Sequence, residues 1–280
     1  MAISRHRSDG AQYAMRIFFC GGDMRTIALV VAYDGTKFAG WQRQDGQKTV
    51  QGCLESAVSK MNNSPTEVRG ASRTDAGVHA EWQIAAFETV RDYDAERYKI
   101  AINALTPPEI TIRHACEAPA GFQPRFESQG KHYRYWLYQG KYLPPMLLNR
   151  AAHVRPLDID NMRRAARYLL GEHDFSAFRA ADCQARTPVR TITRLDIAAV
   201  SGPYVYPCFD DDAIVQIDVE GTAFLKQMVR IIVGTLMRFG LGEDPEQMRV
   251  ILESKQRALA GETAPACGLT LVKSFSSLKF

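Results

Sequence analysis

Three polar side chains that could do chemistry lie within seven residues of one predicted loop. They are Arg73, Asp75 and His79, in the segment 70–80 with the sequence GASRTDAGVHA. Gly77 allows a tight backbone path there. A carboxylate beside an arginine stays ionised, because the positive charge favours its charged form, and such an aspartate can act as a nucleophile or a base. The alternative is a polar hairpin loop with a surface ion pair, and the loop alone does not decide between them.

Regular elements on both sides must position this loop. In the first half, β-branched and apolar runs alternate with helical spacings. One helix is closed by a Pro107-Pro108 pair. The patterns predict strands over residues 26–33, 83–90 and 109–117 and helices over residues 50–61 and 95–105.

The second half repeats this rhythm loosely. Aromatic residues alternate with polar ones in its first strand, and Gly171 is a natural stop for the helix that follows. The patterns predict strands over residues 131–138, 191–200, 213–220 and 269–275, and helices over residues 158–170, 225–239 and 245–253.

This order of elements predicts an α+β fold of two halves, each a sheet with helices on one face. The boundary is expected between residues 118 and 130, a stretch with Pro119, Gly121 and Pro124. We therefore expect a leader over residues 1–23, a first half over 24–124 and a second half over 125–280.

Composition narrows the class of protein. The net charge of +4 over 280 residues is compatible with a polyanionic partner without demanding one. The six cysteines form no C-x-x-C pair, and scattered thiols fit a reducing cytosol. No stretch approaches the roughly 18 apolar residues of a membrane span. The sequence has no G-x-G-x-x-G motif and no P-loop, so it gives no support to a nucleotide-cofactor enzyme.

The leader allows three interpretations. It carries Arg5, Arg7 and Arg16 against one acid, which is somewhat like a transit peptide. It has little serine and no clear amphipathic period, which favours a disordered extension or a true start at Met15 or Met24.

The loop string RTDAGVHA resembles the signature loop of the TruA family of tRNA pseudouridine synthases. Seven further segments match that family in order, so the resemblance runs from about residue 27 to residue 275. These segments are YDG with GWQRQ (33–44), VQ (50–51), KHYRY (131–135), LGEHDFSAF (170–178), RTPVR (186–190), FLKQMVRIIVG (224–234) and GL-x-L (268–271).

The resemblance implies a role for several residues. Asp75 would be the catalytic carboxylate, acting as nucleophile or as base. Arg230 would pair with it, and Arg73 would be a basic group beside it. Tyr133 would lie against the target base and Leu269 would line the pocket, because a base that leaves its stack needs aromatic and apolar walls.

The resemblance also implies a fold and partners. The halves would be RRM-like (ferredoxin-like) and form a mostly antiparallel mixed sheet, with helices on one face and a central catalytic cleft. The substrate would be uridine at positions 38–40 in the anticodon arm of tRNA. A cytoplasmic homodimer would bind the tRNA across both subunits. No cofactor and no metal are expected, because the isomerisation oxidises nothing and imports no group.

Each residue also has an ordinary structural interpretation. Arg230 lies off the apolar stripe of its helix and would be a solvent-facing charge without the motif. Tyr133 would be strand packing and Leu269 would be core. We interpret His79 as a hydrogen bonder that stabilises the turn, since the reaction already has its carboxylate.

Arginines are the candidates for RNA contacts. The family match favours Arg179 and Arg186 as phosphate-binding residues. Three helical arginines allow either RNA contact or a solvated helix face, namely Arg163, Arg164 and Arg167.

One departure from the family concerns Gln123, which stands where many relatives have histidine, and it puts one RNA contact in doubt. A non-catalytic RNA-binding protein with the same fold is the competing hypothesis. It gives no reason for an ionised Asp75 that faces RNA phosphates.

Overall fold

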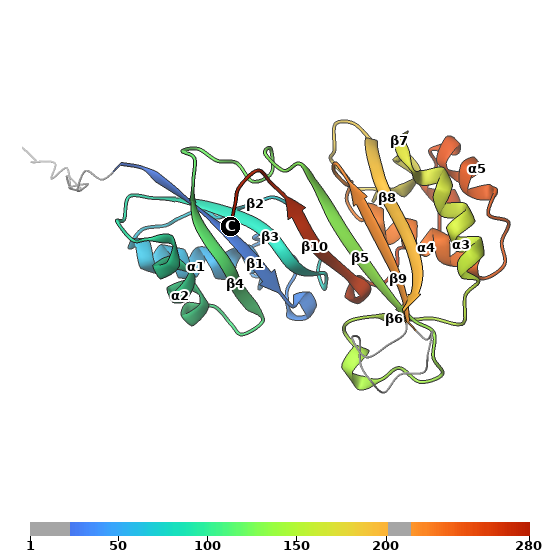
Figure 1. Cartoon of the computed structure of the whole chain (residues 1–280), viewed down its shortest axis with the longest axis horizontal. Coiled ribbons are helices and arrows are strands. Elements are labelled where there is room, and N and C mark those ends of the chain that lie inside the picture. Colours follow the sequence, from blue (N-terminus) through green and yellow to red (C-terminus); the bar gives the residue numbers. More distant parts are fainter. Residues whose placement is uncertain (1–22, 201–213) are drawn as a thin grey trace, which may run out of the picture.

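The computed structural model describes residues 23–200 and 214–280. Within these ranges the chain forms one sheet of ten strands and five α-helices (Figure 1). The strands are β1 (Arg25–Tyr33), β2 (Arg69–Gly70), β3 (His79–Thr89), β4 (Ile110–Ala118), β5 (Gly130–Tyr138), β6 (Ala152–His153), β7 (Gly171–Asp174), β8 (Val189–Val200), β9 (Ile214–Gly221) and β10 (Leu269–Phe275). The helices are α1 (Val50–Asn62), α2 (Ala95–Leu105), α3 (Ile159–Ala166), α4 (Met228–Gly240) and α5 (Gln247–Ser254).

Both halves of the sheet follow one strand order. The first half runs β4-β1-β3, with β2 on the side of β3 that faces away from β1. The second half runs β10-β5-β9-β8. Numbered within each half, the order is 4-1-3-2, with helices after the first and third strands, as in a ferredoxin-like unit. Strand pairs within these units are antiparallel. The predicted α+β fold with a mostly antiparallel mixed sheet is therefore confirmed.

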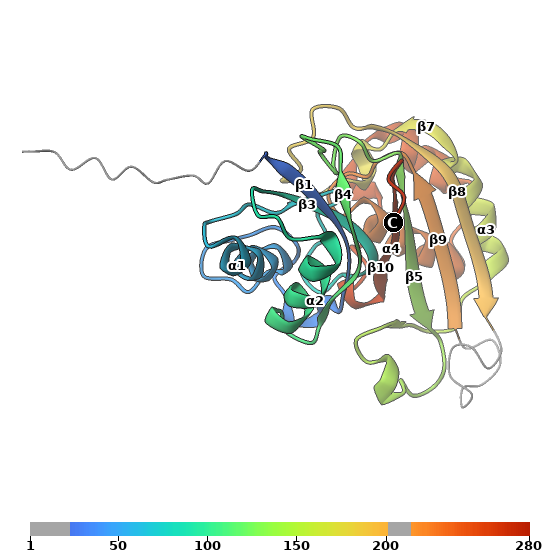
Figure 2. The ribbon, with the colours of Figure 1, turned by 60° about the vertical axis from the view of Figure 1, so that its left-hand side comes forward.

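The last strand joins the two halves. Strand β10 pairs antiparallel with β5 and parallel with β3, where Thr270 lies opposite His79 and Leu271 opposite Ala80. Figure 2 shows β10 between the strands of the two halves. The two-residue parallel contact places the start of β3, which is also the end of the signature loop (residues 70–80), beside the second half.

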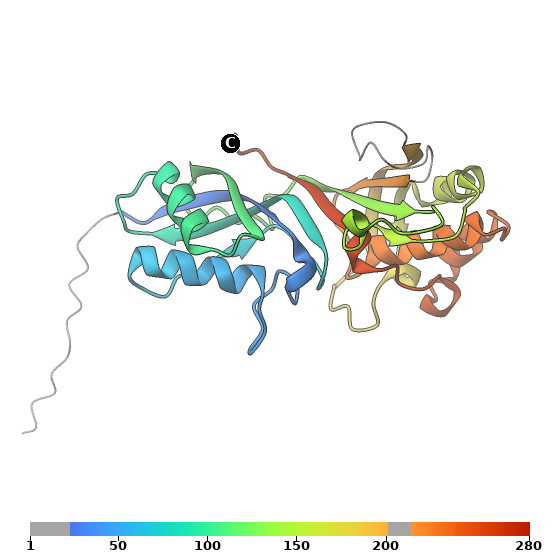
Figure 3. The same cartoon turned by 90° about the horizontal axis from the view of Figure 1, so that it is seen from below.

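One hydrophobic core lies under both halves, on the helix side of the sheet. Alternate residues of a strand share a face, and those on one face of β1, β5, β8 and β9 pack with α1, α2, α3 and α4 in a single buried cluster. Figure 3 shows α1 and α4 on the same side of the sheet. The prediction of helices on one face is confirmed.

The sequence located most elements closely and misplaced a few ends. Both α2 and β10 have their predicted limits. Helix α4 begins at Met228 instead of residue 225, because Gln227 adopts a left-handed backbone (φ 60°) that a helix cannot continue through. Helix α3 gives way to a 3-10 turn (Arg167–Leu169) before Gly171. Strands β2, β6 and β7 were not predicted, since two to four residues carry little periodicity.

The predictions for the leader, and for residue 213 at the start of β9, lie outside the described residues. Within the described ranges, no helix combines the length and the apolar character needed to cross a bilayer.

Candidate active site

The signature loop is held by the segment that follows β1. The hydroxyls of Tyr33 and Thr74 are 2.7 Å apart, and the Thr74 carbonyl accepts a hydrogen bond from the Trp41 N–H at 3.1 Å. Gly40 makes this approach possible, because a Cβ there would lie 2.7 Å from the same carbonyl oxygen. Gly77, at φ 80°, takes the left-handed conformation that its place in the turn requires.

A buried amide closes the base of the loop. The Gln83 side chain is fully buried; it accepts from the Ser72 N–H at 3.2 Å and donates to the Ser72 carbonyl at 2.6 Å. This pair fixes Ser72, whose hydroxyl lies 2.8 Å from the Tyr133 hydroxyl. The loop of the first half is thereby tied to β5 of the second.

Asp75 and Arg230 form an ion pair across the junction of the halves. The Arg230 guanidinium donates to the Asp75 carboxylate at 3.0 Å, with side-chain exposures of 14% and 23%. Arg230 Nε also donates to the Ala264 carbonyl at 2.8 Å, and the Ala264 N–H donates back to the Arg230 carbonyl at 3.1 Å. The guanidinium is thus oriented before any substrate binds, while the carboxylate keeps a partly exposed edge.

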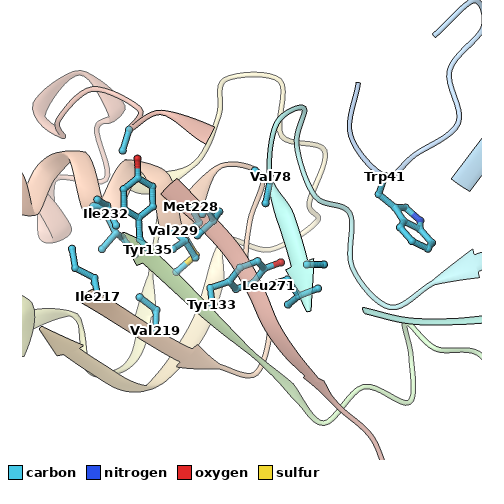
Figure 4. Close-up of a cluster of buried hydrophobic side chains, with 14 of the residues drawn as sticks. Trp41, Val78, Tyr133, Tyr135, Ile217, Val219, Met228, Val229, Ile232 and Leu271 are labelled. Carbon is cyan, nitrogen blue, oxygen red and sulfur yellow. The ribbon is translucent and has the colours of Figure 1, made fainter. Parts of the chain in front are cut away.

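Tyr133 presents its ring beside this ion pair. It lies on the helix face of β5 with its hydroxyl directed toward the first half (Figure 4). The Phe224 ring packs edge-on against it, with centroids 5.3 Å apart. Burial raises the pKa of Tyr133 to about 12, the Ser72 hydrogen bond opposes that rise, and the nearby Asp75 charge adds to it. The phenol is therefore neutral near pH 7. Leu269, at the start of β10, is buried in the same core.

His79 bonds two segments that are far apart in sequence. Its Nδ1 accepts from the Gly35 N–H at 3.1 Å, which leaves a hydrogen on Nε2 for the Cys267 carbonyl at 3.2 Å. Burial lowers the pKa of His79, and the Asp34 carboxylate partly opposes this. These contacts agree with the hydrogen-bonding interpretation of His79.

Within the described chain, no hydrogen bond or ion pair joins the other predicted site arginines to Asp75 or Arg230. Arg73 is exposed, with no hydrogen bond or ion pair to the rest of the described chain, so the partner of Asp75 is Arg230 and not its loop neighbour. Arg179 is half-buried after the 3-10 turn Ser176–Phe178, and Arg186 is exposed. Of the helical arginines, Arg163 donates to the Ile197 carbonyl and pairs with Asp160.

Lys226 is a cation near the site that the sequence analysis missed. It pairs with Asp182, which is the main cause of its raised pKa, and the Asp75 charge adds to that rise. It lies in the segment before α4. That segment ends at Gln227 in a left-handed conformation, which no residue pattern in the sequence predicts. Ser72 and Gln83 were missed too, because a polar residue in a loop and one in a strand have no distinctive spacing. Among the described residues, no group of three or more His, Cys, Asp or Glu could hold a metal ion.

Comparisons with known proteins identify the relatives of this chain. A sequence model of the family described as tRNA pseudouridine synthase matches residues 29–127 and 165–275. The tRNA pseudouridine synthase A of Geobacter sulfurreducens is 42% identical over 89% of this chain and 99% of its own length. The proteins of that name from Acetivibrio thermocellus and Myxococcus xanthus are 41% and 42% identical over 90% of this chain and over 100% and 92% of their own lengths.

Among solved structures, the archaeal box H/ACA sRNP Nop10–Cbf5 complex aligns with a TM-score of 0.35 and 12% identity, over 89% of this chain and 49% of that one. The family match and the identity of more than 40% over nine-tenths of the chain are decisive: this chain belongs to the tRNA pseudouridine synthase family.

Proposed function

We propose that this protein converts uridine to pseudouridine at positions 38–40 of the tRNA anticodon stem-loop, with Asp75 as the catalytic carboxylate. The observation that supports this most is the ion pair of Asp75 with Arg230 at 3.0 Å, beside the Tyr133 ring, at the junction of the two halves. The positions in tRNA follow from the resemblance to the TruA family.

The chemistry needs one oriented carboxylate and no imported group. The N1–C1′ bond breaks, the base turns, and a C5–C1′ bond forms; C5 loses its proton and N1 gains one, so the product is an isomer. Asp75 would start the reaction by attacking the nucleoside or by removing a ribose proton. Arg230 would hold the carboxylate in position and balance its charge.

The target base would be flipped out of the RNA to reach Asp75. Flipping costs a few kcal/mol, and aromatic and apolar walls repay part of it. The Tyr133 ring, braced by Phe224 and by the Ser72 hydroxyl, is suited to lie against a uracil face. Its raised pKa fits a neutral wall better than a general base. Leu269 would contribute an apolar surface.

The arginines around this centre would bind the RNA. Arg73 is exposed on the catalytic loop and has no protein partner among the described residues, so its guanidinium is available to a phosphate. Arg179 and Arg186 would extend this contact along the second half. The units 24–124 and 125–280, and a cytoplasmic homodimer across which tRNA is held, belong to the same proposal.

Tritium release from tRNA labelled at C5 of uridine tests this function. We expect the protein to release tritium without any added cofactor, and we expect mapping of the product to place pseudouridine at positions 38–40. Binding of tRNA with no tritium release would support a non-catalytic RNA-binding protein instead. Release from uridines elsewhere would leave the reaction standing and overturn the assigned positions.

A further inference from the structure

Three cations that have no acidic partner among the described residues gather at the start of β5. Lys131 lies two residues before Tyr133, so both side chains are on the helix face of the strand. Arg190, two residues before the core residue Ile192, is on the same face of β8. Arg125 comes from the connection between β4 and β5. Arg125 and Arg190 are both close enough for their charges to act on Lys131.

The burial of Lys131 is unusual for a lysine. Only 8% of the residue is exposed, and lysine is almost never fully buried without a partner. Within the described part of the chain, its ammonium has one hydrogen-bond acceptor, the Ser128 hydroxyl, at a long 3.4 Å. Burial, and after it the charges of Arg125 and Arg190, lower the pKa of Lys131 to about 8. No carboxylate of the described residues pairs with its ammonium.

Polar atoms beside Lys131 are buried and unpaired. Ser274 on β10 is directly opposite Lys131 and is 1% exposed, and its hydroxyl makes no hydrogen bond within the described chain. Among the described residues Arg190 Nε is likewise buried without an acceptor, while Nη1 of the same guanidinium donates to the Thr187 and Val189 carbonyls. A buried polar group left without a partner destabilises the folded state.

An anion with several acceptor oxygens would satisfy all these groups at once. Phosphate suits guanidinium and ammonium donors together. The site also lies where a substrate would pass: two residues along a strand span about 7 Å, so the cations are roughly one nucleotide's reach from the Tyr133 ring.

We propose that Lys131, Arg125 and Arg190, with the Ser274 and Ser128 hydroxyls, form a binding site for one backbone phosphate of the RNA substrate, next to the flipped nucleotide. This rests on the proposed function, since it takes the RNA to be held at Tyr133. The phosphate fixes the backbone on one side of the target base and supplies the negative charge that the cluster lacks.

Salt dependence of tRNA binding tests the site without requiring turnover. In an Asp75→Asn background, each phosphate contact contributes about 0.7–0.9 to the slope of log affinity against log salt. We expect Lys131→Gln and Arg125→Gln each to lower that slope by about this amount. Lys99→Gln, on α2 and paired with Glu96, is the matched control and should keep the full slope. Arg125 is exposed, so its variant remains informative if Lys131→Gln fails to fold.

The pH dependence of binding gives a second readout. Lys131 must be protonated to bind phosphate, so above pH 8 the tRNA affinity of the protein should fall, approaching tenfold per pH unit. The charged groups that face Lys131 are Arg125 and Arg190, and neither loses its proton in this range. Lys131→Arg should therefore bind tRNA at pH 9 as it does at pH 7.5.

Three outcomes would overturn the proposal. The first is an unchanged salt slope in both glutamine variants. The second is a Lys131→Arg variant that keeps the pH dependence. The third is a stabilisation of the protein by inorganic phosphate that is lost in Lys131→Gln, while the tRNA affinity of that variant is unchanged. This result would indicate a site for a free anion. Tritium release by the unmutated protein is measured separately, so loss of the proposed function and loss of this site are distinguishable.

Discussion

At the scale of single residues, the site depends on an ion pair whose members are 155 positions apart in the chain. Asp75 is on a loop of the first half, and Arg230 is in the first turn of α4 in the second. The pair keeps the carboxylate oriented, and because it is partly exposed it contributes little to stability.

Arg230 should therefore be needed for turnover more than for folding. We expect Arg230→Met to lower kcat on the order of 10²-fold, as loss of a positioned charge does in other active sites, with a small change in tRNA affinity. Arg238→Met is the matched control, since Arg238 is on the same helix and also combines an ion pair with a carbonyl hydrogen bond. Equal kcat losses in the two variants would show that Arg230 acts only through the helix.

His79 gives the protein a pH-dependent stability. Its pKa is lowered in the folded state, so the unfolded chain takes up a proton first as pH falls. The stabilisation that neutral His79 gives to the fold is complete above the pKa of the unfolded state, about 6.5. It is lost as pH falls through the lower pKa of the folded state. We expect the free energy of unfolding to drop more steeply from pH 7 to 5 than in His79→Gln, whose amide can still accept from Gly35 and donate to Cys267. Parallel pH profiles in denaturant titrations would contradict this.

At the scale of elements, α4 is held to its position by backbone contact with residues 260–264. Gly234 faces this segment so closely that a Cβ would lie 1.8 Å from the Glu262 carbonyl oxygen. The same contact aligns Arg230 with Ala264 through two hydrogen bonds. The distance of closest approach between α4 and this segment therefore sets the place of the guanidinium.

Gly234→Ala should push α4 away and disturb the site from a distance. We expect a loss of about 1–3 kcal/mol in the free energy of unfolding, together with reduced tritium release. Gly52→Ala on α1 is the control, because its added Cβ would meet one side-chain atom, the Thr49 hydroxyl at 3.0 Å, and no backbone. A Gly234→Ala protein with normal stability and turnover would show that the close approach has no role.

The sequence predicted elements better than it predicted their junctions. Helical spacing located α1 and α2 well, because each has one buried face. The apolar, β-branched run located β1, which is buried on both faces, and β10 was also located within its limits. Asp75 stood out, since its loop has a distinctive string. The position of Arg230 beside Asp75 was expected only from the family motif, because its place off the apolar stripe of α4 indicates a solvent-facing charge. In the sequence Lys131 looks like an ordinary strand residue. Its burial becomes visible only when β5 is paired with β9 and β10.

At the scale of the whole molecule, two ferredoxin-like units share one sheet and one core. Strand β10 belongs to the order of the second unit and also pairs with β3 of the first. That pairing brings the start of β10 against the start of β3, next to the signature loop. No pattern within β10 shows which edge it meets, so this contact could not be predicted from local sequence.

A shared core predicts a single cooperative unfolding transition. Leu271 on β10 is fully buried at the junction, and Leu271→Ala should destabilise the protein by about 2–5 kcal/mol. Leu259→Ala, at a side chain that is 43% exposed, should cost less than about 0.5 kcal/mol. If denaturant unfolding instead showed two transitions, with only one moved by Leu271→Ala, the halves would be independent units.

The central claim is that the Asp75 carboxylate performs the isomerisation. The most direct test compares Asp75→Asn with the unmutated protein and with Asp92→Asn, at a highly exposed aspartate, in tritium release and in tRNA binding. We expect kcat in Asp75→Asn to fall by about 10³-fold or more, while its tRNA dissociation constant stays within about threefold. Normal tritium release by a folded Asp75→Asn protein would contradict the central claim.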